Sequence, residues 1–130
     1  MKQRVVVVDD SAICRALLCE WLHADGDLEV VGEAPDGDSA IELITRLRPD
    51  VATIDLRLPG MSGLEVARAV RADANEAVAA TPILACSASV QPEVRREALD
   101  AGCDAFEGKP FDIRSFADLL LGLIARRAPG

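Results

Sequence analysis

Carboxylates stand at the ends of two apolar segments of the sequence. The β-branched run 5–8 is followed at once by Asp9 and Asp10, and the apolar run 51–54 ends on Asp55. Runs of this kind are typical of strands that are buried on both faces of a parallel sheet. A charge at the end of a buried strand needs water, a cation or a partner group, so these three aspartates are candidates for a binding site.

Two further polar side chains follow later apolar segments. Ser87 comes directly after the segment 83–86, and Lys109 lies two residues beyond the short segment 105–107. The carboxyl ends of parallel strands meet at one edge of a sheet, where ligands bind in open α/β folds. We therefore expect the serine, the lysine and the three aspartates to converge there. Taken singly, each has an ordinary interpretation as a helix cap, a turn residue or a solvated lysine.

Three neighbouring carboxylates cannot all stay ionised without help. Protonation or a divalent cation would relieve the repulsion, and oxygen ligands favour a hard ion, Mg²⁺ with Mn²⁺ as an alternative. We predict direct coordination by Asp10 and Asp55, and an outer-shell role through water for Asp9. The backbone carbonyl of Arg57 is a further candidate ligand.

The same residues could carry out phosphoryl transfer. An aspartate can act as a nucleophile and carry a phosphoryl group, which makes Asp55 a candidate acceptor. Lys109 is a compact cation with three donors, and Ser87 offers a hydroxyl. A cation, the lysine and the hydroxyl would then neutralise the three non-bridging oxygens, as phosphoryl transfer requires.

The elements that must position these residues alternate regularly along the chain. Each expected strand is followed by an amphipathic helix. The first helix covers residues 11–24, and the fifth begins after the Asp112 cap. The connection 73–81 could form either an extra helix or a loop. In the first helix, apolar residues recur at helical spacing (Cys14, Leu17, Leu18 and Trp21). The expected strands are 5–9, 28–34, 51–55, 83–86 and 105–107. Five strands and five helices in alternation predict one α/β domain over residues 1–130, with a parallel sheet covered on both faces.

Composition excludes several classes of protein. The chain has 130 residues, half of them apolar, and a net charge of −8. This balance argues against disorder and against binding of nucleic acid or of an anionic membrane. There is neither an apolar run of spanning length nor a signal-peptide pattern, so we expect a cytoplasmic protein without membrane contact. The four cysteines lack C-x-x-C spacing and stand with a single histidine, which disfavours a zinc site.

The whole chain resembles the receiver domain of two-component response regulators. The motifs are Asp9-Asp10-Ser11, the segment 55–63 with Leu-Pro-Gly-Met-Ser-Gly, Ser87-Ala88 and Lys109-Pro110-Phe111. The resemblance implies a flavodoxin-like, doubly wound sheet with strand order 2-1-3-4-5. It also implies that Asp55 accepts a phosphoryl group from the phosphohistidine of a histidine kinase or a histidine phosphotransfer protein.

Further roles follow from the resemblance alone. It implies Mg²⁺ at the three aspartates, phosphate sensing by Ser87 and Lys109, and a cis peptide between Lys109 and Pro110. Ser87 and Phe106 occupy the switch positions, where threonine and tyrosine are frequent in the family. For Phe106, a switching role and plain core packing stay open. The signal would reach an unknown downstream protein through the face of the fourth helix, fifth strand and fifth helix, in a monomer or a phosphorylation-dependent dimer.

Segments 9–15 and 27–37 look most like receivers of chemotaxis methylesterases. The chain itself would be no enzyme beyond its own phosphorylation and dephosphorylation, whether it is a single-domain regulator or a part of a longer protein. Two other hypotheses are a degenerate receiver that binds a partner constitutively, and a phosphohydrolase that uses Asp55 on external substrates. The intact set of site residues disfavours the first, and the lack of a substrate-specificity loop disfavours the second.

Overall fold

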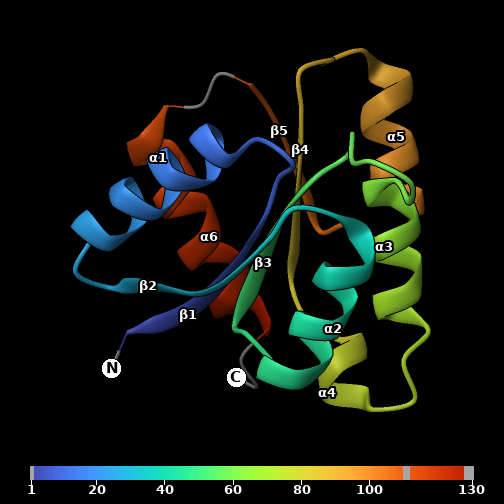
Figure 1. Cartoon of the computed structure of the whole chain (residues 1–130), viewed down its shortest axis with the longest axis horizontal. Helices are drawn as coiled ribbons and strands as arrows, with labels where there is room; N and C mark the ends of the chain where they lie inside the picture. The colour runs from blue at the N-terminus through green and yellow to red at the C-terminus, as the bar shows by residue number, and fades with distance from the viewer. Residues whose placement is uncertain (1, 110–111, 128–130) are drawn as a thin grey trace.

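A computed structural model of the chain has a five-stranded parallel sheet between two layers of helices (Figure 1). It describes residues 2–109 and 112–127, except for the side chains of residues 113, 114 and 127. The strands are β1 Gln3–Val8, β2 Leu28–Ala34, β3 Val51–Asp55, β4 Ile83–Ser87 and β5 Ala105–Gly108. Their order, β2-β1-β3-β4-β5, confirms the flavodoxin-like winding and the place of the second strand at the sheet edge.

Six helices, rather than the five predicted, occur in the described residues. They are α1 Ala12–Ala24, α2 Gly37–Leu47, α3 Gly63–Arg71, α4 Glu76–Ala79, α5 Pro92–Asp100 and α6 Ile113–Arg127. The additional helix is α4, a single turn in the connection that was left open. The side chain of Asn75 accepts hydrogen bonds from the backbone N–H groups of Ala77 and Val78, and Val78 is buried. A cap and one buried apolar residue therefore suffice for this turn.

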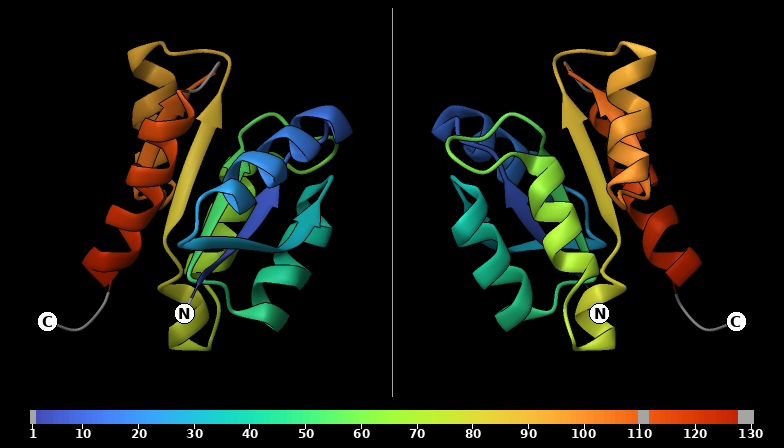
Figure 2. Two further views of the ribbon diagram at one scale, coloured as in Figure 1. Left: turned by 90° about the vertical axis from the view of Figure 1, so that its left-hand side faces the viewer. Right: turned by 90° about the vertical axis from the view of Figure 1, so that its right-hand side faces the viewer.

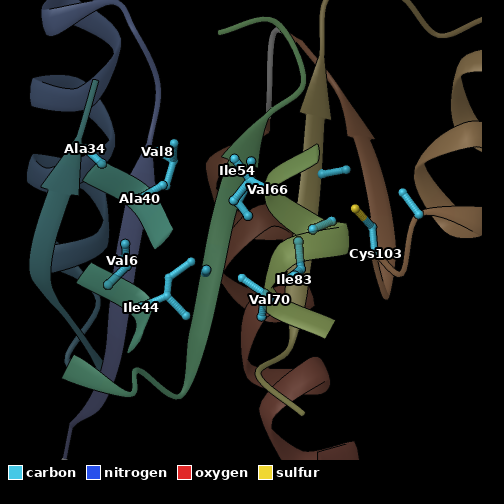
Figure 3. Close-up of a cluster of buried hydrophobic side chains, with 14 of the residues drawn as sticks. Val6, Val8, Ala34, Ala40, Ile44, Ile54, Val66, Val70, Ile83 and Cys103 are labelled. Atoms are coloured by element: carbon cyan, nitrogen blue, oxygen red, sulfur yellow. The ribbon is translucent and has the colours of Figure 1, made fainter. Parts of the chain in front are cut away.

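Helices α1 and α6 cover one face of the sheet, and α2, α3 and α5 cover the other (Figures 1 and 2). The β-branched run of β1 serves both layers, because Val5 and Val7 pack toward α1 and α6 while Val6 and Val8 pack toward α2 and α3. Figure 3 shows the core on the side of α2 and α3, with Val6, Val8 and Ile44 labelled. A strand that is buried on both faces explains the unbroken apolar run in the sequence.

The predicted apolar stripe of α1 was wrong in part. Leu18 and Leu22 are buried against the sheet, whereas Leu17 and Trp21 are 42% and 39% exposed. Residues 18 and 22 are one turn apart, and so are 17 and 21, so the two pairs form neighbouring strips on the helix. The sheet contacts only one of these strips, and the other faces solvent together with Ile13.

The apolar stripe of α6 agrees with the prediction. Phe116, Leu120 and Leu123 are buried in the core beneath α1 and α6, and Leu121 packs against the same cluster. Leu121 therefore belongs to a broad core face of the helix. Among the described residues, no helix combines the length and the hydropathy that a membrane-spanning segment requires.

Candidate functional site

Asp9 is held at the end of β1 by the backbone around it. Its N–H donates to the carbonyl of Ala34 at 3.0 Å, and its Oδ1 accepts from the N–H of Ser11 at 2.9 Å. The Ser11 hydroxyl in turn caps α1 by accepting from the N–H of Cys14. The turn from strand to helix thus fixes a carboxylate that is only 2% exposed.

Asp55 ends β3, in which every residue is buried. Its Oδ1 accepts from the N–H of Arg57 at 2.9 Å. The start of α3 closes tightly on this turn, since Gly63 donates its N–H to the carbonyl of Leu56 at 3.0 Å. A Cβ atom at Gly63 would lie 2.4 Å from the Asp55 carbonyl oxygen. Only glycine permits this close approach of the helix to the strand end.

Lys109 joins the two buried carboxylates. Its Nζ donates to Asp9 Oδ2 at 2.9 Å and to Asp55 Oδ2 at 2.7 Å, and its backbone N–H donates to the carbonyl of Ser87 at 2.9 Å. Desolvation lowers the pKa of Lys109, but the hydrogen bonds and charges of Asp55 and Asp9 outweigh it, so the pKa is raised. The ammonium therefore stays charged, and it neutralises part of the negative charge of the carboxylates.

The three aspartates also fit a divalent cation. One carboxylate oxygen from each of Asp9, Asp10 and Asp55 lies within 4.8 Å of the others. Asp10 is exposed, and within the described part of the chain its carboxylate makes no hydrogen bond or ion pair. Oxygen donors, a free carboxylate and an excess of negative charge over the single ammonium are what Mg²⁺ requires.

A pocket of about 120 Å³ opens beside these groups. It is lined by Asp10, Asp55, Arg57, Ser87, Ser89 and Lys109. Its volume is below that of typical pockets for drug-sized ligands, so it suits a small anionic group. The hydroxyl of Ser87 accepts from the N–H of Ser89 at 3.1 Å. A wider hollow of about 330 Å³ adjoins the pocket and adds Leu58 and Val94 to its lining.

The family model for the response regulator receiver domain matches residues 5–120 of this chain. The chain belongs to this receiver family. It is 40% identical over 114 residues to a protein-glutamate methylesterase/protein-glutamine glutaminase from a Nocardioides species. The match covers 86% of the receiver and 30% of that relative, so the receiver spans about a third of the length of the relative.

Solved receivers share the fold. The signal receiver domain of NarL from Mycobacterium tuberculosis is 38% identical with a TM-score of 0.88, covering 95% of this chain and 97% of that one. The response regulator domain of Thermotoga maritima CheB is 32% identical with a TM-score of 0.80, covering 98% and 96%. The receiver domain of the sensor histidine kinase PA1611 from Pseudomonas aeruginosa, whose structure has a magnesium ion coordinated in the active site cleft, is 27% identical with a TM-score of 0.85, covering 96% and 99%.

The receiver brings together the five side chains that were expected to converge. Arg57, whose backbone carbonyl was a candidate ligand, also lines the pocket, whereas Phe106 does not. Phe106 is half-buried and packs against the core beneath α2 and α3. The predicted cis peptide involves Pro110 and lies outside the described residues.

Three features of the receiver's site were not predicted from the sequence. Lys109 already pairs with two of the carboxylates, and Ser89 lines the pocket. Arg15 donates from Nη1 to the carbonyl of Asp9 at 2.6 Å. The position of Arg15 in the sequence could have indicated its contact. A cation near a helix N-terminus is disfavoured by the helix dipole, so a nearby acceptor group is expected.

Cys86 lies on β4 next to these groups. It is fully buried, and this burial raises the pKa of its thiol. The thiol therefore stays protonated and adds no nucleophile to the site.

Proposed function

We propose that this receiver accepts a phosphoryl group on Asp55 from the phosphohistidine of a histidine kinase or a histidine phosphotransfer protein, with Mg²⁺ or Mn²⁺ bound. One observation carries the proposal. Lys109 donates to the Asp55 carboxylate, and both line a small pocket together with Asp10, whose carboxylate has no partner among the described residues. Such an arrangement positions a nucleophile beside its charge-neutralising groups.

The transfer needs no further covalent partner. A carboxylate oxygen of Asp55 attacks the phosphorus atom as the phosphorus–nitrogen bond breaks, and the electron pair stays on the imidazole, which takes up a proton. Lys109 and the hydroxyl of Ser87 line the pocket, where they can neutralise non-bridging oxygens. A bound Mg²⁺ would supply further charge neutralisation, held by Asp10, Asp55 and the backbone carbonyl of Arg57, with Asp9 acting through water.

The phosphoryl group would shift the receiver between two packings. The hydroxyl of Ser87 would lose the hydrogen bond that it accepts from the N–H of Ser89 and would turn toward the phosphoryl group. The half-buried side chain of Phe106 would then move inward after Ser87. The face of α5, β5 and α6 would carry the signal. Leu99 on α5 is 41% exposed, which supports a surface that a partner can contact.

The downstream target is part of the proposal. The Nocardioides relative carries a methylesterase name and is about three times as long as the matched region. The receiver would therefore regulate a linked output of that kind or a separate protein, as a monomer or a phosphorylation-dependent dimer. In itself it would act as one domain over residues 1–130, without chemistry on external substrates.

The test is phosphorylation by a small phosphodonor, such as phosphoramidate, with Mg²⁺. Wild-type protein should gain one acid-labile phosphoryl group per chain by intact-mass measurement, and Asp55→Asn should gain none. Asp100→Asn changes an exposed carboxylate on α5 and should behave as wild type. Labelling of Asp55→Asn would contradict the site. A wild-type protein that no donor labels would favour a constitutive interaction module.

A further inference from the structure

Arg15 of α1 is a largely buried cation that points back to the end of β1. Its side chain is 18% exposed. Nη1 donates to the carbonyl oxygen of Asp9 at 2.6 Å, and Nε lies 3.5 Å from Oε1 of Glu33 on β2. Hydrogen bonds from a charged donor are among the stronger ones in proteins. Arg15 therefore ties α1 to the strand end that carries the acidic residues.

The carbonyl that Arg15 holds belongs to the peptide between Asp9 and Asp10. A peptide is planar, so fixing its oxygen also fixes the N–H of Asp10 and the direction in which Asp10 leaves the strand. The side chain of Asp9 has its own anchors in Ser11 and Lys109. In the described part of the chain, the Asp10 carboxylate has none, so its placement depends on its backbone.

We propose that Arg15 is a positioning residue for the divalent-cation site. By holding the Asp9–Asp10 peptide, it keeps the carboxylate of Asp10 within reach of that of Asp55, where the candidate ligand atoms lie within 4.8 Å of one another. This inference rests on the proposed function. Glu33 balances the charge of the guanidinium, which limits its repulsion of a bound cation.

The sign of the change in cation affinity separates this role from a structural one. Removing a positive charge near the aspartates favours cation binding, because less repulsion remains. Releasing the Asp9–Asp10 peptide has the opposite effect, because Asp10 must then be ordered on binding. If Arg15 only joined α1 to β2, its replacement would lower the melting temperature, and the folded variant would bind a cation as tightly as wild type or more tightly.

The experiment measures Mn²⁺ binding from the signal of free Mn²⁺ in electron paramagnetic resonance, at fixed ionic strength and well below each protein's melting temperature. For Arg15→Met we expect about tenfold weaker binding, the equivalent of one charge-assisted hydrogen bond. Arg15→Lys keeps the charge and one charged donor for the Asp9 carbonyl, and it should stay within about threefold of wild type. Arg46→Met removes an exposed arginine from α2 and should bind as wild type does.

Folded Arg15→Met that binds Mn²⁺ as tightly as wild type would overturn the inference, and so would an Arg15→Lys variant as weak as Arg15→Met. Should Arg15→Met fail to fold, Arg15→Gln takes its place with the same expectation. Wild-type protein that binds no Mn²⁺ would contradict the proposed cation site itself. Wild-type binding with an unchanged Arg15 variant would contradict only the positioning role.

Discussion

At the scale of single residues, Lys109 decides the charge balance of the site. Asp9 and Asp55 are 2% and 8% exposed, and a buried carboxylate without a partner is costly. The ammonium of Lys109 donates to both, and the lysine side chain is only 24% exposed. We therefore expect the receiver to stay folded without a cation, and the lysine that was expected to contact phosphate to stabilise the phosphate-free protein as well.

The variant Lys109→Met tests this balance. It leaves two buried carboxylates without a counter-charge, so we expect the free energy of unfolding at neutral pH to fall by about 3 kcal/mol. Urea denaturation in the presence of EDTA measures it. Mg²⁺ should restore more stability in the variant than it adds to wild type. Lys2→Met removes an exposed lysine and should change little.

The pH dependence of this effect has a definite sign. The pKa of Lys109 is raised above its ordinary value of 10.5, so its stabilising contribution is complete below that value and is lost as the pH rises through the folded-state pKa. The difference in unfolding free energy between wild type and Lys109→Met should therefore stay constant from about pH 7 to about pH 9. A difference that disappears within this range would show that Lys109 is not the source.

At the scale of elements, the contact between α3 and the end of β3 fixes the backbone of Asp55. Gly63 lies so close that a Cβ atom would overlap the Asp55 carbonyl oxygen and the Cα of Leu56 at 2.4 and 2.7 Å. Both atoms belong to the backbone, so they cannot turn aside as a flexible side chain can. The helix start and the candidate acceptor therefore move together.

Replacing Gly63 by alanine should lower the free energy of unfolding by about 2 kcal/mol, because the methyl group forces the helix away from the strand. Gly122→Ala is the matched control. An added Cβ atom at Gly122 of α6 meets nothing within 4 Å, and alanine favours a helix over glycine by about 1 kcal/mol, so this variant should be more stable than wild type. Chemical denaturation measures both. Equal effects of the two substitutions would contradict the proposed close contact.

The elements also show what the sequence can and cannot predict. The run Val5 to Val8 predicted a doubly buried strand, because both of its faces meet a core. The stripe of α1 was partly wrong, because apolar residues line two neighbouring strips and only Leu18 and Leu22 meet the sheet. Strand topology predicted the convergence of the site residues. The pairing of Lys109 with Asp9 depends on the conformations of two side chains that are 100 positions apart in the sequence, and no local sequence pattern predicts these.

At the scale of the whole molecule, the site exists only in the folded chain. Asp9 and Lys109 come from opposite ends of the sequence, and Asp55 comes from the central strand. A ligand that needs this arrangement binds the native state and not the unfolded chain. Cation binding should therefore be coupled to the stability of the entire receiver.

Mg²⁺ should raise the free energy of unfolding by about 2.7 kcal/mol at a concentration one hundred times its dissociation constant. Asp10→Asn should lose most of this gain, because the exposed carboxylate that is free to bind the cation is gone. Thermal or urea denaturation at matched ionic strength measures the effect, with EDTA as the reference. An equal gain in the Asp10→Asn variant would place the cation elsewhere.

The central claim is that Asp55 carries the phosphoryl group. Borohydride reduces an aspartyl phosphate to homoserine, so mass spectrometry of peptides from the phosphorylated and reduced protein locates the acceptor directly. We predict homoserine at position 55 in protein treated with phosphodonor and Mg²⁺, and none when Mg²⁺ is removed by EDTA. Homoserine at position 9 or 10 in place of 55, or at no aspartate, would contradict the account.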